Sequence, residues 1–258
     1  MTKLAARAAG RMPHLAAAAW LYRLLRKQAS AYASAGADPR SFEELLEPLG
    51  DDRLLGIRSH ELIDLRIATG PVVASQKFDE LAVFLQRARE LRPQRVCEIG
   101  TSAAGTLYAL TRIAEHDAVL ISVDIEISPQ ARELRARLAR GKQRIVSING
   151  DSHDEQTRAR VEQELGGLPI DVLFIDGDHS YEGVRADFDL YSPLVRPGGV
   201  IGLHDINEDY STRHGTPTPS VSGEVPRYWR ELKARSRTEE LISDPEQDGF
   251  GIGIVYPS

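Results

Sequence analysis

Short apolar runs alternate with longer amphipathic segments from residue 95 onward. The apolar runs predict β-strands at Val96–Ile99, Val119–Val123, Ile145–Ile148, Val172–Ile175 and Val200–Leu203. Strands with almost no polar residues suit a parallel sheet that is covered by helices on both faces. The pattern therefore predicts a parallel sheet between two layers of helices.

The segments between these strands predict helices, because their apolar residues recur at helical spacing. They cover Thr106–Glu115, Gln130–Arg140, Asp154–Leu165 and Glu182–Val195, followed by a helix at Val225–Arg235 and further strands at Glu240–Ser243 and Gly251–Tyr256. We expect Asp187 and the other charged residues of its helix to lie on a solvated face. Together the elements predict an α/β fold with a doubly wound, mostly parallel, seven-stranded sheet.

Residues 1–68 predict an N-terminal helical extension. Residues 1–35 are rich in Ala, Arg and Leu, and Ser41 followed by Glu44 indicates a capped helix start. The basic residues around the apolar run at 15–22 fit a helix on a membrane surface, or one packed on its own domain or on a second subunit. We favour packing, and expect a second domain at 69–258 and a homo-oligomer formed through the N-terminal helices.

Composition narrows the classes of partner. The formal net charge of −6 argues against a general nucleic-acid binder, which usually has a basic surface. The single cysteine, Cys97, excludes an internal disulfide, and we expect it to be a small buried side chain in a reducing compartment. No apolar run is long enough to span a bilayer, so we expect a cytoplasmic protein without stable membrane insertion.

The segment V-C-E-I-G-T-S-A-A-G-T at 96–106 predicts a strand that turns into a helix near Gly105. Glycines at 100 and 105 allow a ligand to approach the backbone, and the N–H groups at the helix start point toward it. Glu98 is unusual, because carboxylates are rarely buried and this one lies at the carboxyl end of an apolar strand. An acid there repels phosphate but suits a ligand that carries an ammonium group.

Acids follow three successive predicted strands and should line one crevice, because ligands bind doubly wound sheets at these strand ends. They are Glu98, Asp124 and Asp151. Asp124 is well placed to accept hydrogen bonds from both hydroxyls of a ribose, and Asp151 could accept one from the exocyclic amine of a purine. The alternative for Asp151 is that it caps the following helix. Three acids in register describe a nucleoside-binding cleft.

The glycine spacing indicates which nucleoside ligand fits. A dinucleotide site would normally show G-x-G-x-x-G, whereas this chain has four residues between Gly100 and Gly105. A triphosphate site would need a lysine after the second glycine, and Thr106 stands there instead. An adenosine with a zwitterionic amino-acid tail fits better. That ligand is S-adenosylmethionine.

A second cluster of chemically active residues follows the fourth and fifth predicted strands. Asp176 and Asp205, with His204 or Asn207, could hold a hard divalent cation with open positions for substrate. His179 has an intrinsic pKa suited to taking a proton from a hydroxyl. The alternative is that His179 is a turn residue and His204 a hydrogen-bonded core histidine.

The sequence resembles the class I S-adenosylmethionine-dependent methyltransferases with their Rossmann-like fold. Within them it is similar to the branch that contains macrocin O-methyltransferase, related macrolide-sugar O-methyltransferases and the cephalosporin hydroxylase-like proteins. The resemblance rests on E-I-G-T-S-A-A-G-T at 98–106, F-I-D-G-D-H-S-Y-E-G-V at 174–184, R-P-G-G-V-I-G-L-H-D at 196–205 and G-F-G-I-G-I-V at 249–255. The second and third motifs are the most specific to this branch.

The resemblance implies a set of site residues. S-adenosylmethionine would contact Glu98, Gly100, Thr101, Ser102, Gly105, Thr106, Asp124, Asp151, Ser152 and Asp176. Magnesium would be held by Asp176, His204 and Asp205, with His179 as the general base. Sugar methyltransferases of this kind tend to carry Glu-Asp where this chain has His204-Asp205, and histidine is the softer ligand.

We therefore predict a metal-assisted O-methyltransferase that acts on a hydroxyl of a sugar or glycosylated natural product. The polar segment 207–226 suits such a polyhydroxylated small-molecule acceptor. One alternative is a metal-dependent methyltransferase of a small phenolic or catechol-like acceptor. Another is a non-catalytic S-adenosylmethionine-binding protein that serves as an assembly partner or regulator.

Overall fold

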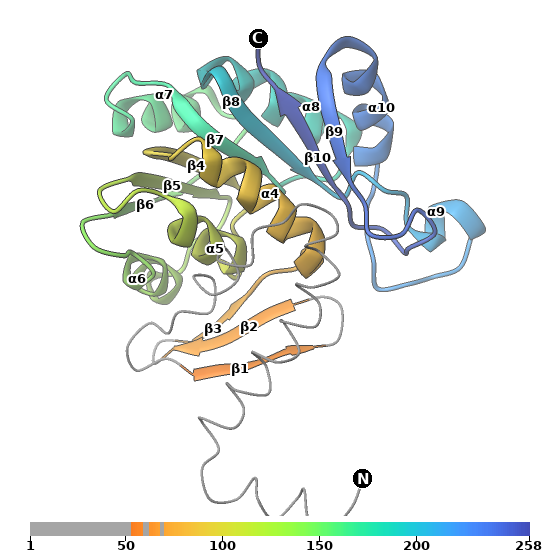
Figure 1. Ribbon diagram of the computed structural model, residues 1–258, viewed down its shortest axis with the longest axis horizontal. Helices are drawn as coiled ribbons and strands as arrows, with labels where there is room; N and C mark the ends of the chain where they lie inside the picture. The colour runs from red at the N-terminus through yellow and green to blue at the C-terminus, as the bar shows by residue number, and fades with distance from the viewer. Residues whose placement is uncertain (1–52, 59–61, 68–69) are drawn as a thin grey trace, which may run out of the picture.

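The computed structural model describes residues 53–58, 62–67 and 70–258, which form two β-sheets with helices packed around the larger one (Figure 1). The larger sheet has seven strands in the order β6-β5-β4-β7-β8-β10-β9. The smaller sheet has three strands in the order β1-β2-β3. Among the described residues, no helix is long and apolar enough to cross a membrane.

The five strands predicted from the apolar runs are present and pair in parallel. They are β4 (Arg95–Ile99), β5 (Val119–Asp124), β6 (Arg144–Asn149), β7 (Ile170–Ile175) and β8 (Val195–His204). β9 (Arg237–Leu241) and β10 (Ile252–Tyr256) complete one edge, where β10 runs antiparallel to β8 and β9. This topology confirms the predicted mostly parallel, seven-stranded sheet.

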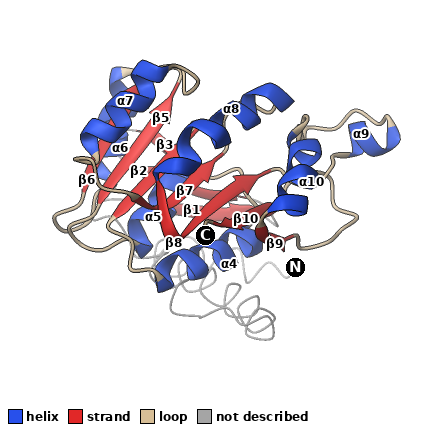
Figure 2. Cartoon of the chain, turned by 90° about the horizontal axis from the view of Figure 1, so that it is seen from above, coloured by secondary structure: helices blue, strands red, loops and turns tan. Residues whose placement is uncertain are grey.

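Helices cover both faces of this sheet (Figure 2). They are α4 (Phe78–Glu90), α5 (Gly105–Ile113), α6 (Pro129–Arg137), α7 (Glu155–Glu164), α8 (Tyr181–Tyr191) and α10 (Val225–Arg235). The short helix α9 (Tyr210–His214) lies in the loop after β8, away from the sheet (Figure 2). Apolar residues of α4, α5 and α6 join one buried cluster, and those of α7, α8 and α10 join another. Cys97 is fully buried in the second cluster, as expected.

The N-terminal prediction is wrong for part of its range. Residues 53–58 and 62–67 form β1 (Arg53–Arg58) and β2 (Leu62–Ile67), which pair antiparallel and continue into β3 (Gly70–Val73). The sequence from 63 to 67 alternates apolar and polar residues, and this period of two favours a strand over a helix. A boundary near residue 69 therefore cuts through a sheet.

The predicted helices at residues 1–35 and from Ser41 lie outside the described residues. The homo-oligomer predicted through these helices involves the same segment, and it stays a prediction.

The helix predicted at 182–195 ends early and has a buried acid. A single 3-10 turn at Ser192–Leu194 contains Pro193, which cannot continue a helix, and Val195 begins β8. Asp187 is 0% exposed, so the expectation of a solvated position is wrong. Neither of its carboxylate oxygens has a hydrogen-bond partner among the described residues, although Nε2 of His153 lies 3.4 Å from Oδ1.

Asp187→Asn should stabilise the protein at pH 8 more than at pH 5. Burial raises the pKa of Asp187 from 3.8 to about 6, and Ser152 and His153 oppose this in part. A raised carboxyl pKa means that stability is lost as pH rises through about 6, because the folded state then holds an unfavourable charge. Removing that charge should contribute on the order of 2 kcal/mol at pH 8, which thermal unfolding can measure.

Asp189→Asn is the matched control for this substitution, because it makes the same chemical change in the same helix at a half-exposed side chain. It should leave the unfolding temperature almost unchanged at both pH values. Equal effects of Asp187→Asn at pH 5 and pH 8 would contradict the buried charge.

Candidate functional site

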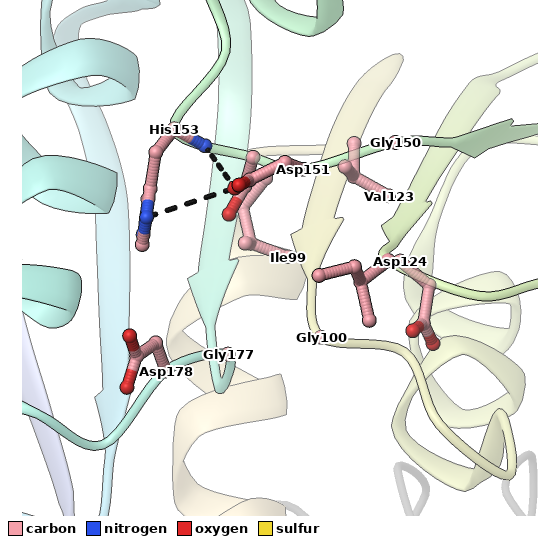
Figure 3. A pocket seen from close by; sticks show the side chains of 11 residues that line it. Ile99, Gly100, Val123, Asp124, Gly150, Asp151, His153, Gly177 and Asp178 are labelled. Atoms are coloured by element: carbon pink, nitrogen blue, oxygen red, sulfur yellow. Dashed lines mark hydrogen bonds and ion pairs between the residues drawn. The ribbon is translucent and has the colours of Figure 1, made fainter.

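Two cavities lie along the carboxyl ends of the parallel strands, and Gly100 lines both of them. The first has a volume of about 320 Å³ and is bounded by residues that follow β4, β5, β6 and β7. Figure 3 shows Asp124 on one side of this cavity and His153 and Asp178 on the other. The second cavity has a volume of about 540 Å³ and contains the Asp/His cluster together with residues from the C-terminal loops.

The turn between β4 and α5 has the strained backbone that the glycine spacing indicated. Gly100 has φ +81°, and Ser102 and Ala104 also have positive φ values, at +42° and +63°. A Cβ on Gly100 would overlap the carbonyl oxygen of Asp176, so no larger residue fits there. Gly105 is the first residue of α5, which confirms the predicted turn from strand into helix.

Glu98 is buried beneath this turn. Its side chain is 1% exposed, and Oε2 has no hydrogen-bond partner among the described residues. Burial raises the pKa of Glu98 well above its usual range, and a hydrogen bond with Thr101 opposes this in part. Neither cavity has Glu98 among its lining residues. A buried carboxyl oxygen without a hydrogen bond destabilises the folded protein, and a hydrogen-bond donor of a ligand near the turn could pair with it.

Asp124 lines the first cavity, where the sequence placed it. Its Oδ2 accepts hydrogen bonds from the backbone N–H of Ser102 at 2.8 Å and from Arg135 at 3.0 Å. Its Oδ1 has only a 3.5 Å contact with the N–H of Glu126. One oxygen is therefore committed to the protein and the other is available to a ligand. Ile125, which sequence reasoning missed, lies beside Asp124 with 73% of its surface exposed.

Asp151 and Ser152 line the same cavity. Asp151 does not cap α7, because Asp154 holds that position and accepts from the N–H of Gln156 at 2.9 Å. Instead, Asp151 accepts from the N–H of His153 at 2.9 Å (Figure 3). The capping alternative for Asp151 is therefore wrong, and its half-exposed carboxylate is free to meet a ligand.

In the second cavity, each of two histidine rings lies close to both of two aspartate carboxylates. Nδ1 of His204 lies 3.1 Å from Oδ1 of Asp176 and 3.2 Å from Oδ2 of Asp205. Nε2 of His179 lies 3.4 Å and 3.6 Å from the same two oxygens. All four residues line the cavity. The sequence prediction that these residues converge is confirmed.

The arrangement differs from the predicted metal set in one residue. Ligand atoms of Asp176, His179 and Asp205 all lie within 4.8 Å of one another, and this donor set fits a divalent cation. His204 is not part of that group, because its Nδ1 already points between the two carboxylates and its ring is 4% exposed. Asn207 donates to the carbonyls of the 247–249 segment and is likewise outside it.

The opposite charges in this cluster stabilise one another. The hydrogen bond to Asp176 raises the pKa of His179 to about 9, against the opposing effect of burial. Burial lowers the pKa of His204, but the charges of Asp205 and Asp176 outweigh it and raise that pKa well above its usual range. Burial likewise raises the pKa of Asp176, but the two histidines outweigh it and lower the pKa. Without a ligand, both rings therefore hold a proton at neutral pH.

The Asp/His cluster is also surrounded by residues that the sequence prediction did not assign to the site. Gln76 is 2% exposed, donates to Oδ2 of Asp176 at 2.6 Å and accepts from the hydroxyl of Thr106. Lys77 and Phe250 line the wall, with the ammonium group of Lys77 5.8 Å from the ring centre. These residues lie outside the strand–helix alternation, so no spacing could connect them with Asp176.

The segment 207–226 forms part of this wall, as its polar composition predicted. Pro219, Ser220 and Val221 line the cavity. The carbonyl oxygen of Val221 lies 2.7 Å from Nδ1 of His179, which fixes the ring and directs Nε2 toward the carboxylates. The segment is therefore a structural part of the site.

Gly100→Ala should destabilise the protein by about 1–3 kcal/mol more than Gly166→Ala does, because the new methyl group overlaps the Asp176 backbone. Gly166 is the matched control: its φ of +64° imposes a similar backbone penalty, but a Cβ there meets nothing within 4 Å. Denaturant unfolding measures both changes. Equal losses in the two variants would contradict the close contact between Gly100 and Asp176.

Comparisons with known proteins agree with this geometry. Residues 97–206 match the family described as a methyltransferase domain. The demethylmacrocin O-methyltransferase of Streptomyces fradiae is 32% identical over 126 residues, which cover 46% of this chain and 29% of that protein. The mycinamicin VI 2''-O-methyltransferase of Micromonospora griseorubida is 31% identical over 106 residues, covering 40% and 26%. The chain thus spans less than a third of the length of either relative.

A solved structure shows the same fold. The O-methyltransferase TomG of Streptomyces achromogenes, determined in complex with SAM, superposes with a TM-score of 0.52 at 18% identity. The match covers 72% of this chain and 82% of that one. The strand order and the single antiparallel strand β10 of the large sheet are those of the Rossmann-like methyltransferase fold. The chain therefore contains a methyltransferase domain of the matched family and is distantly homologous to the demethylmacrocin and mycinamicin O-methyltransferases.

Proposed function

We propose that the chain is an S-adenosylmethionine-dependent O-methyltransferase that acts on a hydroxyl of a sugar or glycosylated natural product, with a divalent cation in its site. The observation that carries this proposal is the meeting of the two cavities at Gly100. One cavity has the features of a nucleoside site, and the other holds a cluster of acids and histidines. A methyl donor bound across Gly100 would place its sulfonium between them.

The first cavity suits the adenosine of S-adenosylmethionine. The free Oδ1 of Asp124 can accept from the ribose hydroxyls, and Asp151 from the adenine amine. Ile125 offers an exposed apolar surface to a flat base. The methionine tail would then pass along the turn at Thr101 and Ser102 toward the start of α5 at Thr106, where its ammonium group could approach the unpaired oxygen of Glu98.

The second cavity suits a hydroxylated acceptor. Most of its lining residues are of polar type, among them Lys77, Ser220 and Asp248. A divalent cation held by the carboxylates of Asp176 and Asp205 would supply positive charge that lowers the pKa of an acceptor hydroxyl, and Nε2 of His179 would stay off the metal to take the proton. The names of the two relatives, which specify O-methylation of demethylmacrocin and of the 2'' oxygen of mycinamicin VI, support an alcohol of this kind.

His179 is the residue we assign to proton transfer. Val221 anchors one ring nitrogen, so that the other faces Asp176 and the cavity. Because its pKa is raised, the ring already holds a proton in the free site. It can take a proton from the acceptor only when another cation balances the charge of the two carboxylates and the ring has lost its own proton. Because the donor carries a good leaving group, the remaining task of the protein is to align acceptor oxygen, methyl carbon and sulfur in one line.

A phenolic or catechol-like acceptor is the second candidate, and Phe250 is the observation that favours it. This ring lines the cavity and could pack against a flat acceptor. Methyl transfer from labelled S-adenosylmethionine to a panel of glycosides and a panel of phenols would distinguish the two classes. A chain that binds the donor but methylates neither panel would support the non-catalytic alternative.

His179→Ala should retain binding of S-adenosylmethionine but lose about 10²–10⁴-fold in turnover, the usual contribution of a general base. Isothermal titration measures binding, and transfer of a labelled methyl group measures turnover. The matched control is His116→Ala, an exposed histidine in the turn before β5 at the opposite edge of the sheet. It should leave both quantities unchanged, and full activity of His179→Ala would remove that residue from the base role.

Removal of divalent cations with EDTA should abolish turnover, and added Mg²⁺ should restore it. Asp205→Asn should weaken the restoration, because it replaces a charged oxygen ligand by a neutral one. Titration of turnover against free Mg²⁺ gives the apparent affinity in each case. Turnover by the metal-free enzyme that is insensitive to EDTA would dismiss the cation and leave the methyltransferase proposal intact.

A further inference from the structure

We propose that Arg135 is a positioning residue that holds Asp124 and the turn after β4 in the shape required by the ribose of the ligand. The inference deepens the proposed function, because it rests on the first cavity as an adenosine site. Arg135 lies in α6 with 1% of its surface exposed, although a guanidinium group is costly to bury. It lies on the same helix face as Leu134 and Leu138, whereas the arginines at 132 and 137 of the same helix are exposed.

Arg135 joins α6 to two other segments around the cavity, the strand β5 and the turn after β4. Nη1 donates to the hydroxyl of Ser122 on β5 at 3.0 Å. Nη2 donates to the carbonyl of Ser102 in the turn at 2.9 Å and to Oδ2 of Asp124 at 3.0 Å. The hydroxyl of Ser122 in turn donates to that of Thr101 at 2.9 Å. One side chain thus fixes the strand, the turn and the acid that follows the strand.

These bonds form a closed ring around one carboxylate oxygen. Oδ2 of Asp124 accepts from Arg135 and also from the N–H of Ser102, whose carbonyl accepts from the same guanidinium. Ser102 has φ +42°, a conformation that a residue with a side chain adopts only when its surroundings impose it. The ring therefore does two things: it stabilises the strained turn, and it prevents the carboxylate from rotating.

The consequence for ligand binding concerns the other oxygen. Because Oδ2 of Asp124 is held, Oδ1 is fixed in one orientation toward the cavity. It can therefore accept from the vicinal hydroxyls of a ribose without a loss of side-chain entropy on binding. Arg135 is not itself a phosphate-binding residue, because it is buried and does not line the cavity. Its contribution should therefore appear as discrimination between sugars that differ in their hydroxyls.

The experiment compares two ligands on four proteins by isothermal titration. The ligands are S-adenosylhomocysteine and its 2′-deoxyribose analogue, and the proteins are the wild type, Arg135→Met, Arg135→Lys and Arg137→Met. The wild type and Arg137→Met should prefer the ribose ligand by about tenfold, the effect of one charge-assisted hydrogen bond. Arg135→Met should bind S-adenosylhomocysteine about tenfold more weakly and prefer it by less than about threefold.

Arg135→Lys keeps the charge but cannot reach all three acceptors, and it should give an intermediate preference between the two ligands. It also preserves the test if Arg135→Met fails to fold, which circular dichroism and thermal unfolding would reveal. An Arg135 variant that weakens both ligands equally, with the preference unchanged, would show a purely structural role and overturn the inference. A wild type that does not bind S-adenosylhomocysteine would overturn the proposed function together with this inference.

Discussion

The site depends on the contact between Gly100 and the backbone of Asp176. The N–H of Gly100 donates to the carbonyl of Val123 at 3.0 Å, and the N–H of Asp176 donates to the carbonyl of Ile99 at 2.9 Å. These bonds continue the parallel ladders of β4 beyond its last residue and align the ends of three neighbouring strands. Because Gly100 has no side chain, its backbone lies directly against that of Asp176, and Gly100 lines both cavities.

Acids that are buried or partly buried recur along this edge, and each has a different arrangement of partners. Asp124 is paired with Arg135, and Asp176 is paired with His179 and His204. Glu98 keeps one oxygen without a partner among the described residues. Pairing orients the first two, whereas the unpaired acid raises the energy of the ligand-free state. A cationic ligand would relieve that cost, so the same arrangement favours binding and disfavours phosphate.

Sequence periodicity was sufficient for the parts of the site that follow strand ends. Glu98, Asp124 and Asp176 were found because apolar runs locate strands, and strand order in a doubly wound sheet locates their ends. Arg135 and Gln76 could not be found this way, since their roles come from contacts across 11 and 100 residues that leave no period. Asp187 illustrates the opposite error: its polar type indicated a solvated position, whereas it is buried against the turns before α7 and after β7, at His153 and Gly177.

The two halves of the site differ in how they are built, and under the proposed function this difference would allow the acceptor half to vary while the nucleoside half stays constant. The nucleoside half is formed by strand ends and adjacent turns, whose geometry the sheet fixes. The acceptor half is formed by loops that Glu80 of α4 holds, because its carboxylate accepts from the N–H groups of Ser243 and Gly251 and from the side chain of Gln247. Phe250 and Asp248 lie between these anchors and line the cavity. Changes between the anchors can therefore reshape the acceptor wall without disturbing the strand ends that position the donor.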